Sequence, residues 1–303
     1  MIASLALLKG SELENLPKEL TVILFSVSGL EAHGSHLPLG TKLIQVENET
    51  LALANLLQAR MPHFHFLIMP AIPLMVDGYT SKTSFTVRAH VVRDALVDQC
   101  AALERLGFSQ FLALSSHLTP QHLSAIEDAA RIVSRRKLIK GTKSIFISVN
   151  SANVNSSEVW NSPMVAIPSE HAGAADTAWL LSLDSKFVAP DYQNLPAIEK
   201  PKAGFSHSIA YFKHQVDGYW GNPQEAALIQ AQEASKRQAE LELLVPKIQI
   251  VLEQQKGQSL FQSGYRYFPL NGSFFKSYFL ATLFFLMMLI LVMMNLKEAF
   301  NAD

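Results

Sequence analysis

The chain has 303 residues, a formal net charge of −1 at pH 7 and one cysteine. This length is sufficient for one large core or two modest ones. The near-neutral charge provides no electrostatic basis for binding nucleic acid, and one cysteine excludes an internal disulfide framework. We interpret Cys100 as a small buried side chain on a helix face. Residues 2–8 form an apolar run too short for a secretory signal.

The first candidate site follows an apolar run. Residues 21–27 have the pattern of a buried strand, and residues 43–60 have apolar residues at helical spacing. Three potential metal ligands, Glu31, His33 and His36, lie in the loop between them. Alternate residues of an extended chain point the same way, and open α/β sheets place their sites at the carboxyl ends of strands. We therefore expect Glu31 and His33 to converge on one cation.

Further strands and helices alternate along the chain. Strands are predicted at residues 63–69, 108–114 and 143–149, and helices at 86–107, from Pro120 onward and at 177–183. We interpret His63 and His65 as solvated or packed histidines. Gly107 suits a helix C-cap, and Pro120 suits a first helical turn. The alternation predicts a three-layer α/β domain with a largely parallel central sheet flanked by helices.

Two later segments carry site-like residues at a strand end or a helix start. Residues 115–120 read Ser-Ser-His-Leu-Thr-Pro, and residues 169–177 read Ser-Glu-His-Ala-Gly-Ala-Ala-Asp-Thr. The side chains of interest in them are His117, Thr119, His171 and Asp176. A last helix is expected from Pro223 towards Leu244, with an interruption at Pro246.

These segments together resemble the creatininase family of metal-dependent amidohydrolases. The first loop matches the family's Glu-x-His-Gly-x-His-Leu-Pro pattern, and the resemblance covers about residues 15–240 in four ordered segments. It implies a site at the strand ends, a closed homo-oligomer and a substrate with a C–N bond. The metal ligands that it implies are Glu31, His33, His117 and Asp176, with His171 as the catalytic residue and His36 elsewhere in the pocket.

The chain departs from the family at two site positions. Lys42 stands where the family has an aspartate shared by two metal ions, and Thr119 stands where some members have a glutamate. A protonated ammonium group cannot ligate a metal, so two ordinary metal ions are not expected. The family's Ser-x-Glu-His and Phe-Pro-Gly-Thr segments are also not recognisable within residues 75–85.

Two hypotheses follow for the altered site. In the first, which we prefer, the ammonium group of Lys42 replaces the lost metal among Glu31, Asp176, His33 and His117. The protein is then a pseudoenzyme without a cofactor that binds a small ligand or serves as a scaffold for a protein partner.

In the second hypothesis, one divalent ion, zinc or manganese, remains on Glu31, His33 or His117, and Asp176. Three protein ligands and an open position are typical of catalytic metal sites. His171 then acts as general base or acid. The activity expected is cleavage of a C–N bond in a cyclic amide, a formamide or a peptide.

The C-terminal part predicts a membrane anchor. Residues 277–296 contain no charged side chain, and twenty helical residues span roughly 30 Å, the thickness of a bilayer core. We therefore expect a domain at 1–245, a connector at 246–276, a transmembrane helix in contact with lipid at 277–296 and a short tail at 297–303. Basic residues are more numerous before the span than after it, which predicts a tail anchor with a cytoplasmic domain.

Overall fold

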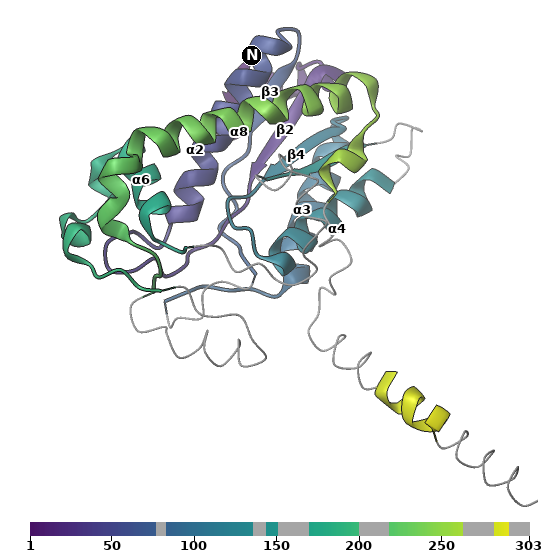
Figure 1. The fold of residues 1–303 in the computed structure, drawn as a ribbon. Helices are drawn as coiled ribbons and strands as arrows, with labels where there is room; N and C mark the ends of the chain where they lie inside the picture. Colours follow the sequence, from purple (N-terminus) through teal and green to yellow (C-terminus); the bar gives the residue numbers. More distant parts are fainter. Residues whose placement is uncertain (77–82, 136–143, 151–169, 200–217, 263–281, 291–303) are drawn as a thin grey trace, which may run out of the picture.

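The computed structural model describes residues 1–76, 83–135, 144–150, 170–199, 218–262 and 282–290. Their centre is a five-stranded sheet with the strand order β1-β3-β2-β4-β5, and every neighbouring pair is parallel (Figure 1). The strands are β1 (Ile2–Ser4), β2 (Thr21–Ser26), β3 (His65–Ile68), β4 (Gln110–Leu114) and β5 (Ile145–Val149). The predicted α/β class with a parallel central sheet is confirmed.

Helices cover both faces of the sheet. Helices α2 (Thr41–Arg60) and α8 (Ala226–Gln254) lie on one face, and α3 (Ala89–Arg105) and α4 (Pro120–Arg135) lie on the other (Figure 1). Along β2, Val22 and Leu24 pack under the first pair of helices, whereas Ile23 and Phe25 pack under the second. Because both faces are covered, parallel strands are apolar throughout, and β2 is wholly buried.

Smaller elements complete the domain. Helix α6 (Ala174–Leu183) contacts α8, and Ala178 and Leu180 join a third apolar cluster that contains Tyr219. Further helical segments of the domain, among its described residues, are α1 (Gly10–Glu14) and the 3-10 helices Leu5–Leu7, Lys18–Leu20, Ser185–Phe187, Pro190–Asn194, Pro223–Glu225 and Gln258–Phe261.

The structure confirms most of the predicted elements within a few residues. The C-cap at Gly107 is confirmed by its φ of +96° and by two hydrogen bonds, from Gly107 N to Glu104 O (2.9 Å) and from Phe108 N to Leu103 O (3.1 Å). Cys100 is fully buried, as expected. The sequence pattern did not predict β1, which has only three residues.

The interruption predicted at Pro246 is wrong. Helix α8 continues through Pro246 to Gln254. A proline inside a helix costs about 3 kcal/mol, but Val245 and Ile248 on either side are buried in the core, and each such burial contributes about 1.5–3 kcal/mol. Residues 248–261, which we expected in a connector, add more buried side chains to the same core, namely Ile248, Val251, Leu252 and Phe261.

The expected membrane span at 277–296 lies mostly outside the described residues. Its described part, residues 282–290, is helical, and every one of these nine residues is exposed. Within the ranges that the structure describes, no helix has both the length and the apolar character needed to cross a membrane.

The packing of the end of α8 can be tested with two isoleucines. Ile248 is 0% exposed and Ile250 is 39% exposed. We expect Ile248→Ala to lower the free energy of unfolding by about 2–5 kcal/mol, because it leaves a cavity in the core. Ile250→Ala serves as the control and should cost less than about 1 kcal/mol. Denaturant unfolding measures both; equal losses would show that this part of α8 does not belong to the core.

Candidate metal centre

The candidate site lies where the chain connections diverge. The chain leaves β2 for α2 on one face of the sheet and leaves β4 for α4 on the other. Loops that turn in opposite directions from adjacent parallel strands open a crevice at their carboxyl ends. The β2 loop carries Glu31 and His33 into this region, and the β4 loop carries His117. The predicted position of the site is therefore consistent with the fold.

Three buried side chains form a group that could hold a metal ion. Glu31, His33 and His171 each offer a ligand atom, and these atoms lie within 4.8 Å of one another. The exposed fractions are 3%, 0% and 8%, so a bound cation would lose most of its contact with water. His171 comes from the segment just before α6, far from the other two in sequence.

Backbone carbonyls fix the tautomers of both histidines. His33 Nδ1 donates to the carbonyl oxygen of Glu31 (2.9 Å), and His171 Nε2 donates to that of Ala32 (2.8 Å). A carbonyl can only accept, so the lone pair of each neutral ring is on the other nitrogen. His33 Nε2 is buried and has no hydrogen-bond partner among the described residues. Metal-binding histidines typically donate their second nitrogen in this way.

Trp220 holds His171 through both its ring and its backbone. The two rings stack with their centres 5.0 Å apart, and the two backbones exchange two hydrogen bonds of 3.0 Å. The carboxylate of Glu170 accepts from the backbone of Ala174 and Ala175 and so caps α6. Ala172, between these features, has a φ of +50°, a strained value typical of functional sites.

The charges of the group suit a cation. Burial lowers the pKa of His33 to about 3, so His33 is neutral and able to ligate. Burial alone would raise the pKa of Glu31. The histidines His117 and His171 outweigh it and hold that pKa well below its usual range. Glu31 is therefore an ionised carboxylate at neutral pH.

His117 contacts this group through Glu31. Its Nδ1 lies 3.4 Å from Glu31 Oε2, and its Nε2 donates to the carbonyl oxygen of Val76 (3.0 Å). The hydroxyl of Thr119 donates to the same carbonyl (3.0 Å). Thr119, which stands in place of a family glutamate, therefore helps to fix the β4 loop.

Asp176 is engaged by other partners. Its Oδ1 accepts from Lys42 Nζ (2.5 Å) and Gln45 Nε2 (3.1 Å), and its Oδ2 accepts from the backbone N–H of Ala172 (3.1 Å). Burial alone would raise the pKa of Asp176, but the charge of Lys42 outweighs it and holds that pKa far below its usual value. Asp176 thus lies outside the three-residue group, and Lys42 pairs with it as one hypothesis expected.

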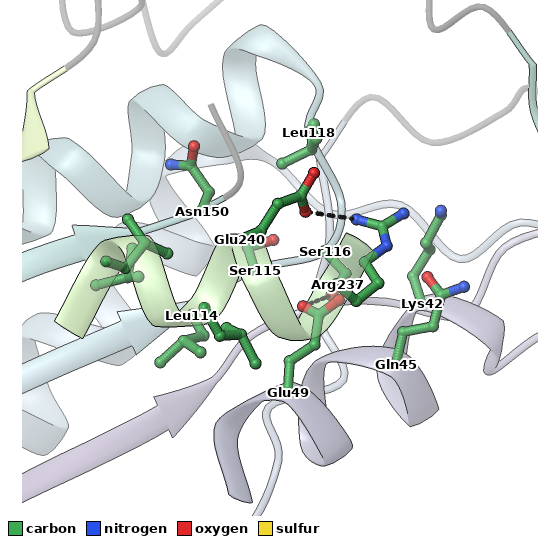
Figure 2. Close-up of a pocket in the computed structure, with 13 residues that line it drawn as sticks. Lys42, Gln45, Glu49, Leu114, Ser115, Ser116, Leu118, Asn150, Arg237 and Glu240 are labelled. Carbon is green, nitrogen blue, oxygen red and sulfur yellow. Dashed lines mark hydrogen bonds and ion pairs between the residues drawn. The ribbon is translucent and has the colours of Figure 1, made fainter. Parts of the chain in front are cut away.

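A small cavity lies beside Lys42. Figure 2 shows Lys42 and Gln45 projecting from α2 next to Arg237 of α8. The cavity has a volume of about 70 Å³. Glu49 also lines it and accepts a hydrogen bond from Ser116 (2.8 Å).

His36, expected elsewhere in the pocket, has a bridging position. The hydroxyl group of Thr177 donates its single proton to Gly173 O (2.7 Å). Its oxygen must therefore accept the hydrogen bond from His36 Nε2 (3.0 Å). The ring also meets Tyr219 edge-on, with the ring centres 5.7 Å apart. His36 therefore links the β2 loop to α6.

Two residues at the site were not predicted to have a role there. Gln45 lies one helical turn after Lys42, and this spacing could have identified it. Trp220 was not singled out, and its stacking on His171 has no sequence signal.

Comparisons with known proteins agree on one family. A family model described as creatinine amidohydrolase (creatininase) matches residues 6–240. A comparison with curated proteins gave no significant match.

Solved structures with the same fold include three relatives. A Bacteroides fragilis NCTC 9343 protein assigned as a creatinine amidohydrolase is 19% identical, with a TM-score of 0.59 over 83% of this chain and 95% of its own. A structure named creatininase Mn is 16% identical (TM-score 0.58; 83% and 97%). A glutamate-to-glutamine mutant creatininase of Zn-Zn type is 15% identical (TM-score 0.60; 81% and 96%). With the match of the family model over most of its length, the chain belongs to the creatininase family.

Proposed function

We propose that this protein is a single-metal member of the creatininase family that hydrolyses a C–N bond in a small amide. The ligands would be Glu31, His33 and His171. The observation that carries the proposal is the buried Nε2 of His33, which has no hydrogen-bond partner among the described residues. Leaving such an atom unsatisfied costs about 1–3 kcal/mol, and a bound cation would remove this cost. Zinc and manganese are the candidate ions, because related structures are named for them.

Lys42 would take the place of a second ion. Its ammonium group lies 2.5 Å from Asp176 and brings one positive charge to the region where the family is implied to share a carboxylate between two metals. A second dication beside this ammonium group would be repelled at close range in a buried site. One metal ion and one lysine are therefore the arrangement that these residues support.

The remaining residues suit amide hydrolysis. A bound divalent ion would supply Lewis acidity towards an amide carbonyl and would lower the pKa of a bound water. His117 would transfer a proton through Nδ1, the nitrogen that faces Glu31. His171 would serve as a ligand held by Trp220, rather than as the acid or base that we expected.

A second candidate function follows from the ion pair of Lys42. In this alternative the protein is a scaffold or ligand-binding pseudoenzyme, and Lys42 is the resident cation. The three hydrogen bonds at Asp176 favour it, because they satisfy that carboxylate without any metal. The two functions differ in whether Glu31, His33 and His171 retain an ion.

We also propose that residues 277–296 attach the protein to a membrane, with the domain in the cytoplasm. The support is the absence of charged residues in this sequence and the exposure of its described apolar side chains, which ranges from 45% for Met288 to 68% for Phe285. Exposed apolar surface is unfavourable in water and favourable in lipid.

Metal content tests the first proposal. We expect the full-length protein, stripped with chelator, incubated with zinc or manganese and desalted, to retain one ion per chain by elemental analysis. His33→Leu should retain none, whereas His63→Leu at an exposed position should behave like the wild type. The metal-loaded protein should hydrolyse members of a panel of cyclic amides, formamides and peptides. An unmodified protein that retains no ion would support the scaffold function instead.

The role of Lys42 can be measured by unfolding. Lys42→Met removes one partner of a largely buried pair, and we expect a loss of roughly 3 kcal/mol because Asp176 keeps an uncompensated charge. The double variant Lys42→Met/Asp176→Asn should recover most of this loss, since no charge is left without its partner. Lys256→Met at an exposed position is the control. If Lys42→Met unfolds at the wild-type denaturant concentration, Lys42 is not a structural cation.

Membrane attachment can be tested by flotation with phosphatidylcholine vesicles. We expect the full chain to float with the vesicles and the double variant Phe285→Arg/Leu289→Arg to remain at the bottom, since two central arginines raise the insertion free energy by about 5–7 kcal/mol. Leu228→Arg is the control, because Leu228 is 85% exposed on α8, outside the segment. Flotation of the double arginine variant would argue against insertion.

A further inference from the structure

We propose that His122 is a positioning residue that, through Ser115 and Val76, sets the orientation of the His117 ring. The inference rests on the proposed function, because it concerns a histidine of that site. His122 lies in the first turn of α4 and is 0% exposed. Its ring meets the ring of His117 edge-on, with centres 5.1 Å apart. The site residues discussed above do not include it.

The direction of the hydrogen bonds at His122 is determined. The backbone N–H of Val76 can only donate, so His122 Nδ1 accepts from it (3.3 Å). A neutral imidazole then has its proton on Nε2, and this nitrogen donates to the hydroxyl oxygen of Ser115 (3.1 Å). Burial keeps the pKa of His122 well below its ordinary value, which is consistent with a neutral ring.

Ser115 connects the ring of His122 to the backbone of His117. Its oxygen also accepts from the backbone N–H of His117 (3.1 Å), and its hydroxyl donates to the backbone carbonyl of His117 (3.1 Å). A hydroxyl group has one proton and two lone pairs, and the three hydrogen bonds of Ser115 use all of them. The backbone of His117 is thereby fixed relative to α4.

The backbone of Val76 also links His122 to His117. Its N–H is bound to His122, and its carbonyl accepts from His117 Nε2 (3.0 Å) and from Thr119 (3.0 Å). His117 Nε2 therefore carries a proton, and Nδ1 is directed towards Glu31, 3.4 Å from Oε2. Without His122, both Val76 and Ser115 would lose a fixed partner, and the ring of His117 could turn.

The same directions exclude a nucleophilic role for Ser115. A serine nucleophile needs a histidine nitrogen that accepts its proton. Here His122 Nε2 donates to Ser115, and the hydroxyl proton of Ser115 is bound to the carbonyl of His117. The pair of Ser115 and His122 is thus built to position His117.

The experiment compares His122→Leu with His122→Gln, which keeps a donor near the position of Nε2. The first readout is the imidazole ¹⁵N spectrum of His117 in the full-length, metal-free protein. We expect one hydrogen-bonded Nε2–H signal of His117 in the wild type and in His122→Gln, and a split or lost signal in His122→Leu, because the ring can then turn away from Val76. If His122→Leu does not fold, Ser115→Ala has the same expected effect.

The second readout is zinc affinity. We expect His122→Leu to raise the zinc dissociation constant about 10-fold, because a turned His117 no longer holds the proposed ligand Glu31 and losing the partner of a ligand typically costs at least this much. His122→Gln should restore most of the affinity. Val133→Ala, at a fully buried position later in α4, is the control for general destabilisation and should change neither readout.

Two results would overturn the inference. One is an unchanged Nε2–H signal of His117 in His122→Leu or, if that variant does not fold, in Ser115→Ala. The other is a split or lost signal in Val133→Ala. A wild-type protein that binds no zinc would refute the proposed function alone, since the Nε2–H signal is read without metal.

Discussion

The ion pair between Lys42 and Asp176 decides what this site can hold. It joins the first turn of α2 to α6 across 134 residues of sequence, and its two charged atoms are 2.5 Å apart in a largely buried setting. Gln45 and the backbone of Ala172 complete the hydrogen bonds of the carboxylate. Because Asp176 is already compensated, the cation-binding capacity of the site rests with Glu31 and the histidines around it.

Backbone carbonyls determine how those histidines act. The carbonyls of Glu31, Ala32 and Val76 each accept a hydrogen bond from one ring, namely His33, His171 and His117 in turn. One nitrogen of each ring is therefore fixed as a donor. The loops after β2 and β3 supply these carbonyls, so the fold of the loops determines the orientation of the histidines as well as the shape of the site.

Much of the fold could be predicted from the sequence, because strands covered on both faces appear as continuous apolar runs such as residues 21–27. Local rules failed where packing outweighed them, as at Pro246, whose neighbours are anchored in the core. Strand β1 was missed because three residues are too few to show a pattern.

The sequence predicted which residues belong to the site, but not which of them contact one another. The ordered motifs identified Glu31, His33, His117 and His171. Asp176 was one of four partners expected for Lys42, but the sequence could not show that Lys42 would pair with Asp176 while Glu31 lies beside His117. Such pairings depend on the reach of side chains between distant segments. The ring tautomers depend on backbone carbonyls, for which the sequence contains no signal.

The most direct test of the single-metal account is anomalous diffraction from crystals of the protein soaked in zinc. The account predicts one anomalous peak among Glu31, His33 and His171, with Lys42 still paired to Asp176. Two peaks, or a peak bound by Asp176 with Lys42 displaced, would contradict it. The absence of any peak at the site would identify Lys42 as its resident cation.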